Sequence, residues 1–212
     1  DIYISTKLTD FSTLKEVRIV PRLHHYAIEV VYKVKEKTHC DNGKYASIDL
    51  GLNNLATMAF NDGSKPLIVN GRPVKSINQY YNKKKAQYQS RLKGNKRTSK
   101  RICALTNKRN NKVTDYLHKA SRLLVNQLVS KGITTLVIGK NKNMKQDINI
   151  GKVNNQNFVQ LPIMRFADLM KYKCELEGIK VLFNEESYIS KCSFLDKEPI
   201  CKHDKYMGKR VK

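Results

Sequence analysis

Short runs of β-branched and aromatic residues dominate the first third of the chain. Val17–Val20 and Tyr26–Val34 flank a break at Pro21 and predict the two strands of a hairpin. A polar linker, Lys35–Lys44, separates this hairpin from three further short apolar runs. Turns rich in Asn and Gly join these runs, so the spacing predicts three adjacent antiparallel strands at Tyr45–Leu50, Leu55–Phe60 and Pro66–Asn70.

The pattern then changes to the three- and four-residue spacing of helices over Val74–Lys131. A break near Gly94 divides this stretch, and Thr98 or Ser99 can cap the second helix. Apolar residues recur along one side of the second helix, whereas its Lys and Arg residues fall mostly elsewhere: Ile102, Leu105, Val113, Leu117, Ala120, Leu124 and Leu128. The helix is therefore predicted to pack one face on the protein and to expose the other.

The remaining residues predict, in chain order, a buried strand, a polar loop, a helix and a fifth core strand: Ile133–Ile138, Lys140–Gln160, Pro162–Glu177 and Ile179–Phe183. Gly132 and Gly178 lie where the helices end. Three antiparallel strands followed by helix, strand, helix and strand is the element order of an RNase H-like α/β domain. The sequence thus predicts this fold class, with a mixed sheet and a basic helical insertion.

Basic residues greatly exceed acidic ones. Lysine and arginine total 41 against 18 acids, a net charge of +23, which favours nucleic acid through phosphate attraction and counterion release. An anionic membrane surface would also attract such a chain. However, sixteen basic residues and one acid, Asp115, lie between Arg72 and Arg122, in a stretch too polar for a membrane-buried helix face. No apolar run is long enough to span a membrane, so we expect a phosphate-facing surface.

Five cysteines, at positions 40, 103, 174, 192 and 201, form no compact even-numbered framework. Reduced thiols in a cytoplasm are the simplest interpretation. Cys192, Cys201 and His203 could ligate a metal, but they lack the CxxC spacing of structural zinc sites, which normally use four ligands. We therefore expect no zinc.

The one acid inside an otherwise apolar predicted strand is Asp49. A carboxylate there is costly to bury unless it is paired or binds a cation, so it is a candidate metal ligand. An Asp that simply caps the following turn is the alternative. Glu186, just past the last predicted strand, could meet Asp49 if their strands lie side by side. Two such acids can hold Mg²⁺ or Mn²⁺, and two ions about 4 Å apart promote phosphodiester hydrolysis.

Three ordered motifs resemble one known family. The TnpB (OrfB) proteins of insertion sequences resemble this chain in IDLGLNNLATM (Ile48–Met58), NNQNFVQLP (Asn154–Pro162) and NEESYISKCSFLD (Asn184–Asp196). These proteins are relatives of the type V CRISPR effectors and carry a RuvC-like nuclease domain. The resemblance covers about Val17–Lys212. It implies a magnesium-dependent endonuclease in the cytoplasm of a prokaryotic cell. A guide RNA would direct this enzyme to target DNA beside a short flanking motif.

The resemblance also implies roles for particular acids. Asp49 matches the first RuvC aspartate, which would be catalytic and bind the metal ions. The second family acid usually ends the fourth strand, where this chain has Gly139. In one subgroup this acid has moved to the place of Glu186, and Glu185 is the alternative choice here. The third acid follows a basic glycine-containing turn such as Tyr206–Lys212, and the sequence as given ends first.

We therefore expect a fragment, trimmed at both ends, that binds nucleic acid but cuts slowly or not at all by itself. By the same resemblance, residues 1–40 are the C-terminal part of a wedge-like β domain. Residues 41–212 are then the RuvC-like domain without its last motif.

The basic helical stretch resembles the segment that lies along a duplex of guide and target. Tyrosines beside cations provide stacking surfaces next to phosphate contacts, although they could instead pack the first helix against the sheet. The expected nucleic-acid contacts are Lys83, Lys84, Lys85, Tyr88, Arg91, Lys96, Arg97, Lys100, Arg101, Lys108, Arg109, Asn155 and Gln156.

Two other protein classes fit part of the sequence. IDLGLNN also resembles the phosphate loop of actin-like ATPases, but the second phosphate loop and the adenosine motif of those enzymes are missing. A non-cleaving nucleic-acid-binding module is the more serious alternative, because Gly139 could mark a degraded site. That module would bind in a salt-sensitive way without metal, and changing Glu186 would have no effect.

Overall fold

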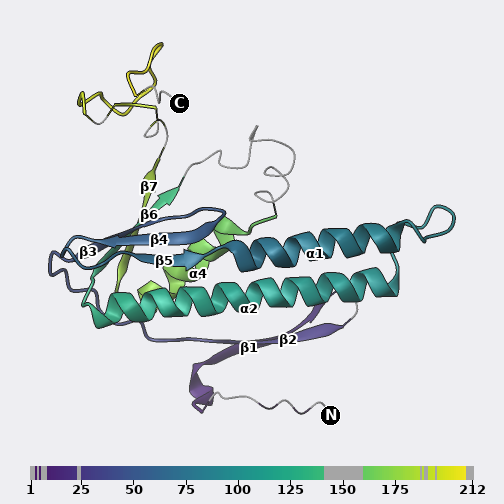
Figure 1. The fold of residues 1–212 in the computed structure, drawn as a ribbon. Helices are drawn as coiled ribbons and strands as arrows, with labels where there is room; N and C mark the ends of the chain where they lie inside the picture. Colours follow the sequence, from purple (N-terminus) through teal and green to yellow (C-terminus); the bar gives the residue numbers. More distant parts are fainter. Residues whose placement is uncertain are drawn as a thin grey trace.

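The computed structural model describes residues 9–22, 25–140, 160–186, 191–193 and 195–208, together with Tyr3, Ser5 and Tyr188. Its central element is a five-stranded mixed sheet (Figure 1). From one edge to the other, the strands are Leu67–Asn70 (β5), Asn54–Phe60 (β4), Tyr45–Asp49 (β3), Thr135–Lys140 (β6) and Lys180–Glu185 (β7). The first three strands pair antiparallel, and β6 and β7 join them in parallel. This order confirms the predicted arrangement of three antiparallel strands followed by two crossovers.

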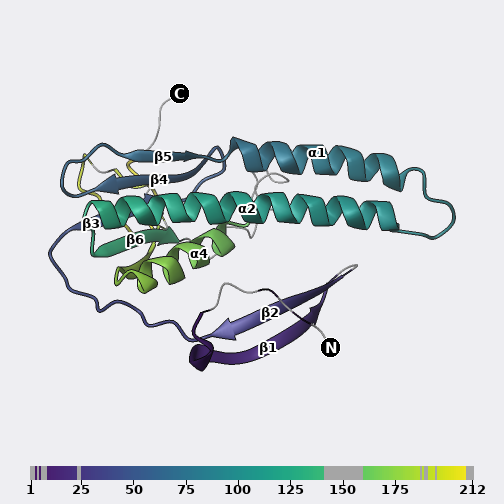
Figure 2. The same ribbon diagram turned by 90° about the horizontal axis from the view of Figure 1, so that it is seen from below.

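The predicted N-terminal hairpin forms a separate two-stranded sheet. After a short 3-10 helix, Phe11–Thr13 (η1), it pairs Leu14–Pro21 (β1) with Tyr26–Tyr32 (β2) in antiparallel register. The linker that follows contacts the main domain: the Lys37 amide donates to Leu176 O at 3.3 Å, and His39 Nδ1 lies 3.0 Å from Gly178 O. The hairpin therefore belongs to a sheet of its own, apart from the five-stranded sheet (Figure 2). Its linker reaches the turn before β7.

Helices cover one face of the five-stranded sheet. In the described residues these are Arg72–Gln89 (α1), Lys100–Ser130 (α2) and Ile163–Leu176 (α4). Both views show α2 and α4 on this face, with α1 alongside α2 (Figures 1 and 2). Ser99 begins α2, because its Oγ accepts the Ile102 amide at 3.3 Å. Although α2 is 31 residues long, none of the described helices is both long and apolar enough to cross a membrane.

The core lies between this sheet face and the helices. Strand residues such as Ile48 and Ile138 meet Leu117 and Leu124 of α2 and Phe166 of α4, all of them buried. Removing side chains of this size from water contributes about 1.5–3 kcal/mol each. Burial alternates along β3, so its other side chains lie on the face of the sheet that no described helix covers, here the uncovered face. That uncovered face is where the candidate acids meet.

Two details differ from the sequence prediction. Strand β6 begins at Thr135 rather than Ile133, because the Ile133 amide instead donates to Leu128 O and closes α2. More importantly, β6 lies between β3 and β7, so the strand that bears Asp49 and the strand that precedes Glu186 do not lie side by side, which was the condition under which the two acids could meet. Each helical crossover adds a parallel strand at the outer edge, which places β6 first and β7 beyond it.

Candidate functional site

Asp49 is the last residue of β3 and lies on the uncovered face of the sheet. Ala46 and Ile48 point into the core, while Ser47 and Asp49 alternate with them and are exposed. Its antiparallel neighbour is Thr57 of β4. The sequence pattern suggested a carboxylate buried in an apolar environment. The Asp49 carboxylate is instead open to solvent.

The residue just before α1 holds the turn after Asp49 in place. The Gly71 amide, just before α1, donates to Asn53 O at 2.7 Å. A Cβ atom on Gly71 would lie 2.2 Å from Leu52 O, so no larger residue fits there without a backbone shift. The junction between β5 and α1 therefore fixes the chain path that follows Asp49.

Glu186 reaches the same face from the far side of β6. Strands β3 and β6 pair Ile48 with Ile138, and the continuing register places Asp49 beside Gly139. A Cβ atom on Gly139 would lie 1.6 Å from Glu186 Oε1 and 2.7 Å from Oε2. The Glu186 carboxyl group therefore fills the space that a side chain on residue 139 would occupy.

This placement shortens the separation between the two acids. The backbones of β3 and β7 are two strand spacings apart, roughly 10 Å. The Glu186 carboxyl lies over the middle strand instead, about one spacing from the backbone of Asp49. The structure therefore brings these two predicted ligands together across Gly139, although their strands are not neighbours.

The electrostatics of the pair favour a bound cation. Partial burial raises the pKa of Glu186 above its ordinary value, and the nearby Asp49 carboxylate raises it further. Two carboxylates that repel each other are stabilised by a cation between them, and carboxylate oxygens are the ligands that Mg²⁺ and Mn²⁺ prefer. The residues present thus fit a divalent-ion site.

The raised pKa of Glu186 leads to a prediction about stability. The folded carboxyl keeps its proton at pH values where the unfolded one, with a pKa near 4.5, has lost it. Ionisation of Glu186 therefore lowers stability as the pH rises through this window. We expect Glu186→Gln to unfold at a higher temperature than the wild type at neutral pH without divalent ions, as followed by circular dichroism. Added Mn²⁺ should stabilise only the wild type, and equal melting temperatures in the absence of metal would contradict this.

Glu185 has a different position. It is the last residue of β7 rather than part of the following loop. Alternation along β7 places it on the same face as Val181, which packs against the core. Geometry therefore favours Glu186 over Glu185 as the partner of Asp49.

The predicted nucleic-acid contacts lie along α1, α2 and the connection between them. Most are exposed on this part of the surface: Lys83, Arg91, Lys96, Arg97, Lys100, Arg101 and Lys108. Lys84 and Lys85 are half-buried. The Arg101 guanidinium lies 4.7 Å from the centre of the Tyr88 ring, so an aromatic face and a cation are paired as a stacking surface requires. Asn155 and Gln156 lie outside the described residues.

Two of the residues in this region have structural contacts. Arg109 donates to Asn78 Oδ1 at 2.8 Å and to Gln160 O at 3.1 Å, which joins α2 to α1 and to the residues just before α4. The Tyr81 hydroxyl lies 3.1 Å from Thr106 Oγ1, so this tyrosine packs α1 against α2 rather than against the sheet. Arg109 is thus less accessible to phosphate than its exposed neighbours.

The strand order, the crossovers and the paired acids define an RNase H-like α/β domain, and solved structures with this arrangement are similar to the chain. One is the Cas12f1–sgRNA–target DNA complex, with a TM-score of 0.54 and 16% identity over 78% of this chain and 40% of that chain. Another is a CRISPR-Cas12f ternary complex, with a TM-score of 0.56 and 15% identity over 84% and 36% of the two chains. The chain therefore spans less than half the length of each of these two proteins.

Residues 27–145 match the OrfB_IS605 family model, described as "Probable transposase". Because this match covers more than half of the sequence, the chain belongs to that family. No curated protein matches it.

Proposed function

We propose that this chain is the metal-binding, nucleic-acid-binding part of an RNA-guided DNA endonuclease that accompanies transposition. The observation that carries the proposal is the position of the Glu186 carboxyl group over Gly139, close enough to Asp49 for the charge of that residue to raise the pKa of Glu186. Family membership supports it, as does similarity to two effectors, one of which was solved with guide RNA and target DNA.

Asp49 and Glu186 are proposed to hold Mg²⁺ or Mn²⁺ on the uncovered face of the sheet. When bound, such ions activate a water molecule and stabilise the leaving oxygen during phosphodiester hydrolysis. Exposure of Asp49 allows a phosphate group to approach from solvent.

The exposed cations of α1 and α2 are proposed to bind the phosphate backbone. In the described part of the chain, the cations on the connection between the two helices form no ion pair with a carboxylate. Residues 90–100 themselves contain no acid. A cationic surface without local neutralisation attracts a polyanion strongly at low salt. The proposed partner is a duplex of guide RNA and target DNA.

Binding to a labelled RNA–DNA hybrid at several salt concentrations tests the surface. Lys96→Ala/Arg97→Ala should weaken binding and reduce the slope of log affinity against log salt by about one for each phosphate group that is no longer bound. The matched control Lys65→Ala/Lys180→Ala removes the same charge elsewhere and should keep the wild-type slope. Equal effects of the two double variants would show that only net charge matters.

Cleavage distinguishes the endonuclease from the non-cleaving module. With Mn²⁺ and a labelled DNA strand, we expect slow cutting that Asp49→Asn abolishes. Cutting that persists in Asp49→Asn would contradict the proposed site. The non-cleaving module would instead bind nucleic acid without metal, show no cutting and bind no Mn²⁺ at Asp49 and Glu186.

A further inference from the structure

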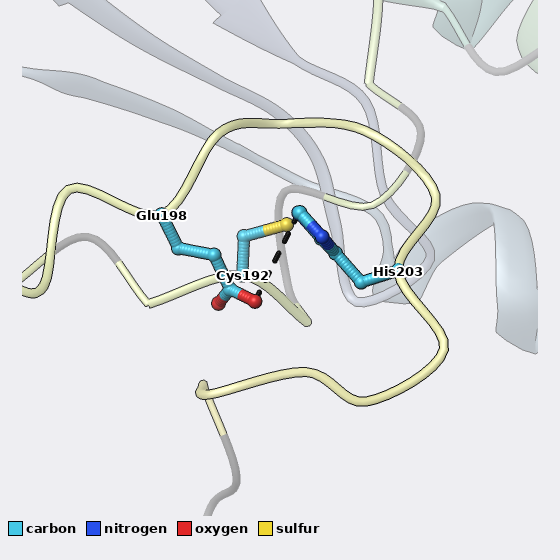
Figure 3. Close-up of side chains that lie close together, drawn as sticks. All are labelled: Cys192, Glu198 and His203. Carbon is cyan, nitrogen blue, oxygen red and sulfur yellow. Dashed lines mark ion pairs between the residues drawn. The ribbon is translucent and has the colours of Figure 1, made fainter.

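The loop after β7 gathers polar side chains whose contacts lie within the loop itself. In Figure 3, Cys192, Glu198 and His203 converge, and their donor atoms lie within 4.8 Å of one another. Glu198 accepts the backbone amides of Ser193 at 2.7 Å and Met207 at 3.1 Å, so it stabilises the path of this loop. By contrast, a pocket between α1 and α2 offers groups that can bind a further molecule.

This pocket has a volume of about 300 Å³. Apolar and aromatic side chains line it together with cations of α2: Ile77, Tyr80, Leu105, Lys108, Arg109 and Lys112. Small-molecule sites in proteins range from about 300 to 1,000 Å³ and combine apolar walls with a few polar groups. The pocket therefore fits one small aromatic group that carries negative charge, and it is too small for a duplex.

Tyr80 presents a free ring face at this pocket. It is 60% exposed, and its side chain has no hydrogen bond or ring contact with another described residue. The ring of Tyr81 is occupied instead, because Lys85 Nζ and the Arg109 guanidinium lie 5.7 Å and 5.8 Å from its centre. Nucleobases of any sequence stack on exposed aromatic rings, so Tyr80 is the surface on which a base can lie.

Arg109 adds hydrogen-bond donors to the wall of the pocket. A guanidinium group has five N–H donors, and three of them are used by Asn78 Oδ1, Asn110 Oδ1 and Gln160 O, which leaves two. No carboxylate among the described residues forms an ion pair with this cation, and partial burial lowers the pKa of Arg109. A bound molecule with oxygen or nitrogen acceptors would therefore stabilise the charged side chain.

Lys108 and Lys112 lie about one helical turn apart at the same pocket, and both are exposed. Neither lysine forms an ion pair with a residue that the structure describes. Lysine binds phosphate as a point charge, so a phosphate group attached to a base in the pocket can reach an ammonium group. The charge and the stacking surface thus match a nucleotide rather than an uncharged aromatic molecule.

We propose that this pocket binds one unpaired base of a nucleic acid strand, stacked on Tyr80, with its phosphate groups on Lys108 and Lys112. Arg109 donates to the edge of the base. A base inside a duplex does not fit, because its faces are stacked and its edge is paired. The inference rests on the proposed function, since the exposed cations of α1 and α2 hold the duplex and the pocket holds an unpaired nucleotide beyond its end.

Fluorescence titration with two labelled RNA–DNA hybrids tests the pocket. One hybrid is blunt, and the other carries an unpaired DNA end with 2-aminopurine, a base whose fluorescence falls when it stacks. The wild type should bind the second hybrid at least about fivefold more tightly and quench its 2-aminopurine. Tyr80→Ala should remove both effects and still bind the blunt hybrid as the wild type does. Tyr80→Phe should retain both effects, because it keeps the ring.

Two further variants separate the pocket from general effects. Tyr172→Ala is the matched control, because it removes an exposed tyrosine from another helix, α4, and should leave the preference unchanged. Ser76 is an exposed lining residue, so Ser76→Leu narrows the pocket without disturbing the core and should reduce the preference.

The outcomes keep this inference apart from the proposed function. Salt-sensitive binding of both hybrids with equal affinity would overturn the inference and leave the proposed function standing. A preference that Tyr80→Ala retains would also overturn the inference. Failure of the wild type to bind either hybrid would overturn both.

Discussion

Glu186→Gln is expected to weaken Mn²⁺ binding by at least about 100-fold, and Asp49→Asn should do the same. Loss of a group that merely orients a metal ligand typically lowers affinity 10–100-fold, and these residues are proposed as direct ligands. Glutamine keeps the size of Glu186 and removes its charge, so the fold should be unaffected. Isothermal titration with Mn²⁺ measures the change.

Glu185→Gln is the matched control for this prediction. It removes an acid one residue away whose side chain lies on the opposite face of β7 by alternation. Because its side chain points away from the site, Mn²⁺ affinity should stay within about twofold of the wild type. If Glu185→Gln loses binding and Glu186→Gln keeps it, the two acids have been assigned in the wrong order.

Moving the carboxylate from residue 186 to residue 139 should preserve the site. Gly139→Glu alone forces two carboxyl groups into one space, because a Cβ at this position would meet Glu186 Oε1 at 1.6 Å. We expect this variant to bind Mn²⁺ poorly and to unfold at a lower temperature. Gly139→Glu/Glu186→Ala leaves one acid in that space and should recover Mn²⁺ affinity to within about tenfold of the wild type. The effects of the two substitutions would then be far from additive, as expected for residues in contact.

Two single variants complete this cycle. Glu186→Ala should lose binding because the acid is missing, and Gly139→Ala should weaken binding because its methyl group displaces the Glu186 carboxyl. A double variant that binds no better than Glu186→Ala would show that the two positions do not share one site.

Much of the fold could be predicted because periodicity and turn residues reflect local geometry. The apolar spacing of α2, its Ser99 cap and the Gly178 break after α4 each appear in the structure. Sequence patterns do not report which strands pair, and so the position of β6 between β3 and β7 was missed. Buried Lys173 also had no sequence signal: its ammonium group donates to His118 O and Ser121 Oγ across the α2–α4 contact.

The candidate site could be predicted only in part for the same reason. Asp49 and Glu186 stood out by resemblance and by their places at strand ends. The contact of Glu186 with Gly139 depends on which strands pair and in which register. Local sequence patterns do not report either. Likewise, Arg109 looked like any other cation of the helical stretch, but its contacts with Asn78 and Gln160 appear only when α1 and α2 pack together.

Anomalous X-ray scattering from crystals soaked in Mn²⁺ tests the central claim most directly. We predict a manganese peak on the uncovered sheet face, over β6, within coordination distance of carboxylate oxygens from both Asp49 and Glu186. A peak bound by Glu185 without Glu186, or well-ordered carboxylates with no manganese between them at saturating concentration, would contradict it.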